Sequence, residues 1–61
     1  MRIDLNKTYV MMSPNNELAI IHPLEKLGDG DLGVFVEHGE DKYMVSVTPL
    51  FFKEMTYIGV L

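Results

Sequence analysis

Short segments in which apolar and polar residues alternate occur along most of the chain, separated by turn-forming residues. Alternation with a period of two is typical of β-strands, because successive side chains of a strand point to opposite faces. The segments are also rich in β-branched and aromatic residues, which favour strands. This pattern predicts a mainly β protein, with a small α+β fold as an alternative. The predicted strands are residues 2–12, 17–22, 33–38, 42–48 and 56–61.

Three clusters of turn-forming residues separate these segments. Ser13-Pro14-Asn15-Asn16 combines a proline with fixed φ and asparagines that tolerate positive φ. Gly28-Asp29-Gly30-Asp31 predicts a second loop. His38-Gly39-Glu40-Asp41 joins the segments 34–38 and 42–47, and this pair is the most clearly indicated β-hairpin.

One short helix is predicted near residues 49–55, because Thr48 is a suitable N-cap and Pro49 is favoured at the first helical position. A strand, a short helix and a final strand in this order resemble the end of SH3-like small barrels. The resemblance implies a five-stranded antiparallel SH3-like barrel or sandwich. It implies no function, because one fold serves many functions.

Residues 14–27 allow two interpretations, a strand followed by a turn or a helix. Ser13-Pro14 could begin a helix and Gly28 could end it. Pro23 would then lie in the helix interior, where it costs about 3 kcal/mol. His22 precedes this proline and is biased away from helical backbone. The interpretation as a strand that ends near His22 is therefore favoured, and the helix is kept as the alternative.

The two parities of the predicted strands separate a core set from a second set. The core set is the more apolar one and consists of Ile3, Leu5, Tyr9, Met11, Leu18, Ile20, Val34, Val36, Tyr43, Val45 and Val47. The opposite parity should face water, and it does hold polar residues such as Asp4 and Ser46. It also holds apolar residues: Val10, Met12, Ala19, Ile21, Phe35 and Met44.

This second apolar set has two explanations. A closed barrel with a helix over its second face would bury the set within the chain. Alternatively, the set forms a surface patch for another protein, because exposed apolar patches on small proteins mark interaction sites. Methionine is adaptable and common on such surfaces. The second explanation predicts an interface of Val10, Met12, Ile21, Phe35 and Met44, with an acidic rim of Asp29 and Asp31.

Length and composition limit what the chain can be. Its 61 residues predict a single domain, 1–61. A domain of this size usually needs extra stabilisation from disulfides, a metal ion or self-association. Without cysteine, disulfides are excluded and a reducing compartment such as the cytoplasm is favoured. Self-association, most simply as a homodimer, is then the expected source of this extra stability. The net charge of −4 disfavours nucleic acid, and no segment is apolar enough for a membrane span or a signal peptide.

Residues that could carry chemistry do not form a recognisable site. His22 and His38 lack the spacing of metal ligands, and Asp29-Gly30-Asp31 is not followed by the further oxygen ligands of a calcium loop. Ser13 and Ser46 have no nucleophile motif around them. We therefore predict no catalytic residues, no metal and no cofactor.

The leading hypothesis is a non-enzymatic protein–protein interaction module. Small, acidic, cysteine-free proteins are common among accessory proteins of phages and mobile elements, some of which inhibit a host protein by binding it. Two alternatives stay open, a nucleic-acid-associated small β-barrel and a structural subunit of a larger, virion-type assembly.

Overall fold

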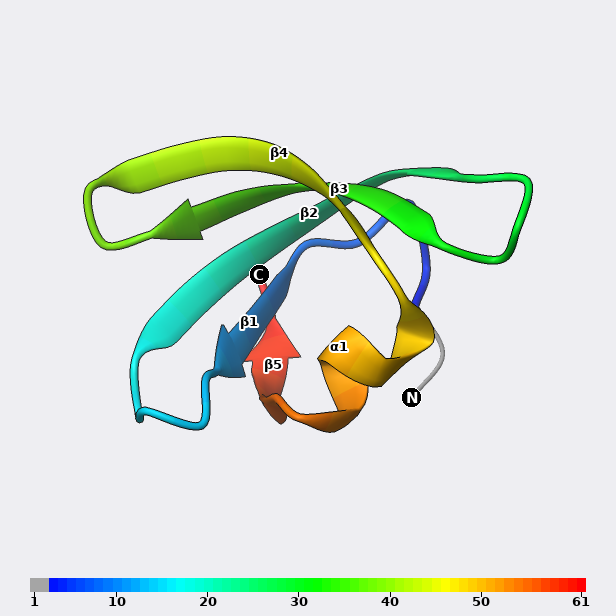
Figure 1. The fold of residues 1–61 in the computed structure, drawn as a ribbon. Coiled ribbons are helices and arrows are strands. Elements are labelled where there is room, and N and C mark those ends of the chain that lie inside the picture. Colours follow the sequence, from blue (N-terminus) through cyan, green and yellow to red (C-terminus); the bar gives the residue numbers. More distant parts are fainter. Residues whose placement is uncertain (1–2) are drawn as a thin grey trace.

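A computed structural model describes residues 3–61, which form five strands and one short helix (Figure 1). The strands are β1 (Tyr9–Met12), β2 (Leu18–Lys26), β3 (Leu32–His38), β4 (Asp41–Val47) and β5 (Thr56–Val60), and the helix α1 (Pro49–Lys53) lies between β4 and β5. The mainly β fold with one helix after Thr48 is confirmed.

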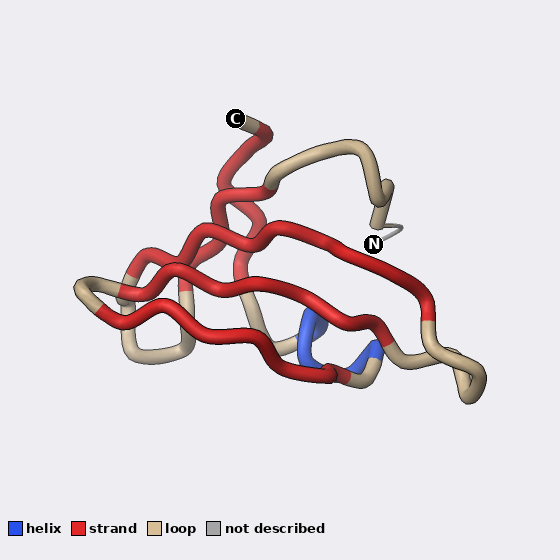
Figure 2. Tube along the Cα trace, turned by 90° about the horizontal axis from the view of Figure 1, so that it is seen from above, coloured by secondary structure: helices blue, strands red, loops and turns tan. Residues whose placement is uncertain are grey.

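All five strands belong to one antiparallel sheet with the order β4-β3-β2-β1-β5. The sheet is strongly curved, and α1 lies on its concave side (Figures 1 and 2). Within residues 3–61 the barrel is not closed, because β4 and β5 are the two edges of the sheet and do not pair with each other. The predicted closure is therefore wrong, and both edge strands keep one side unpaired.

The three predicted turns connect consecutive strands. Asn16 and Gly39 have φ values of 63° and 64°, and Gly30 has 91°. Asparagine and glycine are the residues that adopt this left-handed region most readily. The β3–β4 hairpin is confirmed, with His38 paired to Asp41 across the turn.

The first strand is shorter than predicted, because residues 3–8 do not belong to a strand. Asp4 forms a local turn in which its side-chain Oδ1 accepts a hydrogen bond from the Asn6 N–H. Its carbonyl oxygen accepts a second bond, from the Lys7 N–H. Aspartate commonly competes with strand hydrogen bonds in this way, so β1 begins only at Tyr9.

Residues 14–27 form a turn and a long strand, so the helix hypothesis is wrong. The strand β2 continues through Pro23 as far as Lys26, beyond the predicted end near His22. Proline is tolerated here because β1 pairs with β2 only as far as Ile21. Beyond that residue one side of β2 is an edge, where a missing N–H costs no ladder bond. The register with β3 also shifts between Pro23 and Glu25.

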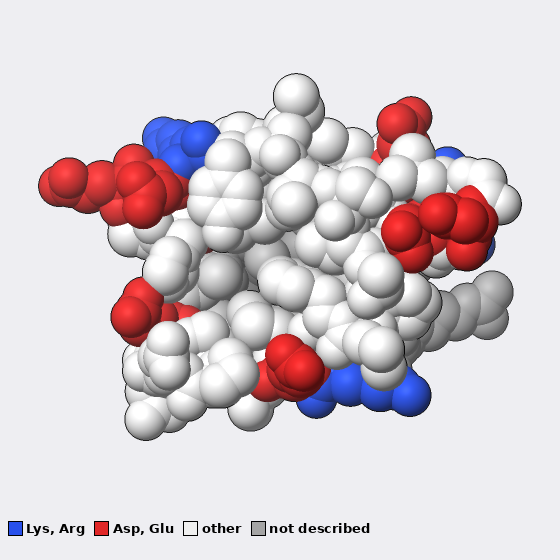
Figure 3. Space-filling model, in the orientation of Figure 1, with Lys and Arg blue, Asp and Glu red and all other residues white. Residues whose placement is uncertain are grey.

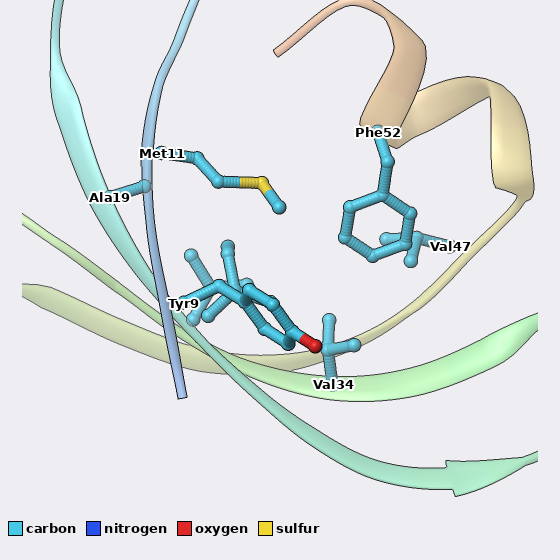
Figure 4. Close-up of a cluster of buried hydrophobic side chains, with 8 residues drawn as sticks. Tyr9, Met11, Ala19, Val34, Val47 and Phe52 are labelled. Carbon is cyan, nitrogen blue, oxygen red and sulfur yellow. The ribbon is translucent and has the colours of Figure 1, made fainter. Parts of the chain in front are cut away.

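A single hydrophobic core fills the concave side of the sheet (Figure 4). Phe52 of α1 packs into it against the strands, and Ile3, Leu32, Phe51 and Met55 pack around it. The buried hydrophobic residues that form this core are Tyr9, Met11, Ala19, Ile21, Val34, Val36, Val47 and Phe52. Five of them, on β1, β3 and β4, belong to the predicted core set.

The face assignment of β2 is wrong. Ile21 is fully buried and Ala19 is 4% exposed, whereas Leu18 is 56% exposed. The register explains the inversion, since Tyr9 pairs with Ile21 and Met11 pairs with Ala19. Cross-strand partners share a face, so Tyr9 and Met11 place the odd-numbered residues of β2 in the core. Leu18 and Ile20 then lie on the opposite face.

Three other residues of the predicted core set are exposed. Leu5 lies in the irregular N-terminal segment and is 37% exposed. Tyr43 and Val45 have the correct parity but lie on the edge strand β4, where they are 46% and 38% exposed. Every residue of β4 from Asp41 to Ser46 is exposed, because the core reaches this strand only at Val47.

Candidate protein-interaction surface

Apolar side chains occupy much of the convex side of the sheet, which we call the outer face. Within residues 3–61 no helix or strand covers this side, since α1 packs on the concave side. Met44 and Leu18 are 74% and 56% exposed, and the others are partly exposed. The apolar residues of the outer face are Val10, Met12, Leu18, Ile20, Phe35 and Met44.

The strand register divides these residues into two neighbouring groups. Val10 is paired with Ile20, and Met12 is paired with Leu18, so these four form one block over β1 and β2. Phe35 is paired with Met44 and forms a second block over β3 and β4. Together the two blocks place apolar side chains on four strands of the outer face.

A polar network lies between the two blocks. His22 Nε2 is 2.7 Å from Glu37 Oε2, and Lys42 Nζ is 3.7 Å from Glu37 Oε1. The His22 ring also packs against Phe35, with ring centroids 5.6 Å apart. The hydrogen bond from His22 lowers the pKa of Glu37 below its ordinary value of 4.5, and the charges of His22 and Lys42 act in the same direction, whereas desolvation opposes them.

Four of the five predicted interface residues lie on the outer face: Val10, Met12, Phe35 and Met44. Ile21 does not, because it is fully buried in the core, so its place in the predicted patch is corrected. Leu18 and Ile20 were missed. The signal that could have found them is the loop of residues 13–17, whose length sets Met12 opposite Leu18 and thereby fixes the faces of β2.

Asp29 and Asp31 lie in the loop between β2 and β3. Asp29 Oδ1 accepts a hydrogen bond from the Asp31 N–H, which fixes the turn locally. Asp31 is four residues along the chain from Phe35, or about 13 Å at the rise of a strand. The two carboxylates therefore lie beyond the end of the apolar surface and do not border its centre.

A second apolar surface lies along β4 and α1, and we call it the β4–α1 edge. Residues 43–52 contain no charged side chain. Figure 3 shows an uncharged area across the molecule with charged groups near its margins. Besides Tyr43, Met44 and Val45, this edge exposes Leu50 (63%). A shallow hollow of about 400 Å³ lies beside Val36, Tyr43, Val45, Val47 and Phe51.

The two histidines of the chain each pair with a glutamate. Among residues 3–61 no group of three or more His, Asp or Glu side chains is placed to hold a metal ion. His22 pairs with Glu37, and His38 pairs with Glu17. Over the same residues, the helix is too short to cross a bilayer.

Comparison with known proteins identifies no relative of this chain. No protein-family model, curated protein or solved structure matches the chain.

Proposed function

We propose that this protein is a non-enzymatic interaction module that acts by occupying a surface of another protein with its outer face. The observation that carries the proposal is the apolar surface of Val10, Met12, Leu18, Ile20, Phe35 and Met44, which no element within residues 3–61 covers. Exposed apolar surface on a small protein marks protein interaction sites. The network of His22, Glu37 and Lys42 supplies polar contacts that orient a partner.

Several features favour a regulatory or inhibitory role, as in accessory proteins of phages or mobile elements. The chain is short, acidic and free of cysteine, which suits a protein that works in the cytoplasm. Such a protein needs no reaction centre, because binding alone blocks the partner surface.

The test uses purified protein bearing Phe35→Asp or, as the matched control, Leu50→Asp. Both changes place a carboxylate at an apolar position outside the core, but only Phe35 lies on the outer face, because Leu50 belongs to α1 on the concave side. Affinity purification from the source cells identifies partners, and calorimetry with each purified partner measures the Kd. We expect Phe35→Asp to raise the Kd at least tenfold, about 1.4 kcal/mol, and Leu50→Asp to leave it within a factor of about two.

Circular dichroism accompanies the binding measurement. Phe35→Asp should keep the β spectrum of the parent, because Phe35 lies outside the buried core. A partner that binds the folded Phe35→Asp variant as tightly as the parent would show that the outer face is not the binding surface.

A further inference from the structure

We propose that β4 pairs with β4 of a second copy of this chain, so that two sheets join into one continuous antiparallel sheet across a two-fold axis at Met44. This deepens the proposed interaction function, because it assigns one partner, the chain itself, to one edge and leaves most of the outer face free.

The free hydrogen-bonding groups of β4 follow from the hairpin geometry. Gly39 and Glu40 form a two-residue turn, so the flanking pair His38–Asp41 is hydrogen-bonded. Hydrogen-bonded and non-hydrogen-bonded pairs then alternate along the ladder. Lys42, Met44 and Ser46 therefore direct their N–H and C=O groups away from β3, toward the unpaired side.

Most of the features that normally protect an edge strand are missing from β4, whose charged residues, Asp41 and Lys42, lie only at its start. Natural edges are short or bulged, or carry prolines, lysines or other charges. The β3–β4 ladder has no register shift over its seven pairs, and β4 contains no proline. The opposite edge, β5, differs, because its ladder with β1 is irregular between Val10 and Met11 and it contains Gly59. The regular edge is thus the one suited to pairing.

A second copy fits this edge better than an unrelated strand does. Met44 is the midpoint of Asp41–Val47, so antiparallel pairing about Met44 uses the whole strand. Tyr43 then lies opposite Val45 of the second copy, a favourable aromatic and β-branched pair. Lys42 lies opposite Ser46, so no like charges face each other. The strand spans about 23 Å, most of the 31 Å length of the molecule.

The charge distribution allows two acidic molecules to approach along this edge. Each copy carries a net charge of −4, but residues 43–52 are uncharged. A two-fold axis perpendicular to the sheet keeps both concave sides on the same side of the joined sheet. The two hollows beside Tyr43 and Phe51 then lie near each other, and their apolar walls are covered from both copies.

Charged substitutions at Met44 test this arrangement. Sedimentation equilibrium of the purified protein measures the dimer Kd of each variant. The parent is expected to be a dimer. Met44→Lys and Met44→Glu each place like charges at the two-fold axis and should raise the dimer Kd at least roughly tenfold. An equimolar mixture of the two variants should restore dimers. Leu61→Lys is the matched control, because Leu61 and Met44 are both 74% exposed, and it should remain dimeric.

Ser46→Pro provides a second variant that leaves the apolar outer face unchanged. It removes an N–H that points away from β3, so the monomer should keep its sheet and lose the dimer. A parent that is monomeric throughout the concentration series, or a Met44→Lys variant that dimerises as the parent does, overturns the edge pairing. Neither result affects the binding test at Phe35, so the two proposals can fail separately.

Discussion

Ile20 and Ile21 are neighbours in the chain but lie in opposite environments. Ile21 is fully buried among the core residues, whereas Ile20 is partly exposed on the outer face beside Val10. Composition and alternation alone cannot separate them, because both residues are equally apolar. The pairing of Tyr9 with Ile21 places Ile21, and not Ile20, in the core.

Substitution at these two positions tests the face assignment. Ile21→Val should reduce the free energy of unfolding by about 0.5–1.5 kcal/mol and Ile21→Ala by about 2–5 kcal/mol, because each leaves a cavity in the core. Ile20→Ala should cost clearly less, since its neighbourhood is open to water. Urea titration monitored by circular dichroism measures all three. Equal losses at both positions would contradict the assigned register.

Glu37 makes stability depend on pH on the acid side. Its pKa in the folded protein lies below the ordinary value of 4.5, so its contribution is complete above about pH 4.5 and is lost as the pH falls through the folded pKa. Glu37→Gln cannot titrate and should show a smaller fall in stability below pH 4.5 than the parent does. Urea midpoints measured between pH 3 and pH 6 give the comparison, and identical profiles would rule out a stabilising role for this carboxylate.

The local sequence predicts the presence of the turns and strands of this protein well. It predicts the residues at which the strands begin and end less well. Gly39 with positive φ and the Asn16 turn were predictable, because few residues adopt this backbone. The loss of strand at residues 3–8 depends on the side chain of Asp4, and the extension of β2 through Pro23 depends on where β1 stops pairing. Such ends are set by neighbouring segments and cannot be predicted from alternation alone.

Two glycine substitutions test the hairpin at the level of the element. Gly39→Ala should destabilise the protein by about 1 kcal/mol, because an alanine at φ 64° is strained although open space surrounds it. Gly28→Ala is the matched control, since no atom lies within 4 Å of its added Cβ and no positive φ is required. It should be neutral or slightly stabilising in thermal unfolding. A neutral Gly39→Ala would contradict the turn geometry.

At the scale of the whole molecule, the sheet remains open and the chain exposes much apolar surface. Within residues 3–61, large hydrophobic side chains are exposed on both edge strands, as at Met44 (74%) and Ile58 (52%). The sequence predicts an excess of apolar strand positions over what one small core can bury. It does not predict that β4 and β5 stay apart, because contacts between distant segments leave no local pattern. The excess accordingly lies at the edges as well as on the outer face.

Hydrogen exchange of the β4 amides, measured by NMR over a protein concentration series, tests most directly whether a second copy covers this exposed edge. The account predicts that the amides of Met44 and Ser46 become protected as concentration rises, while the mass measured in parallel doubles from the 7.0 kDa of one chain. Rapid exchange at both amides in a protein that stays at the monomer mass would contradict it.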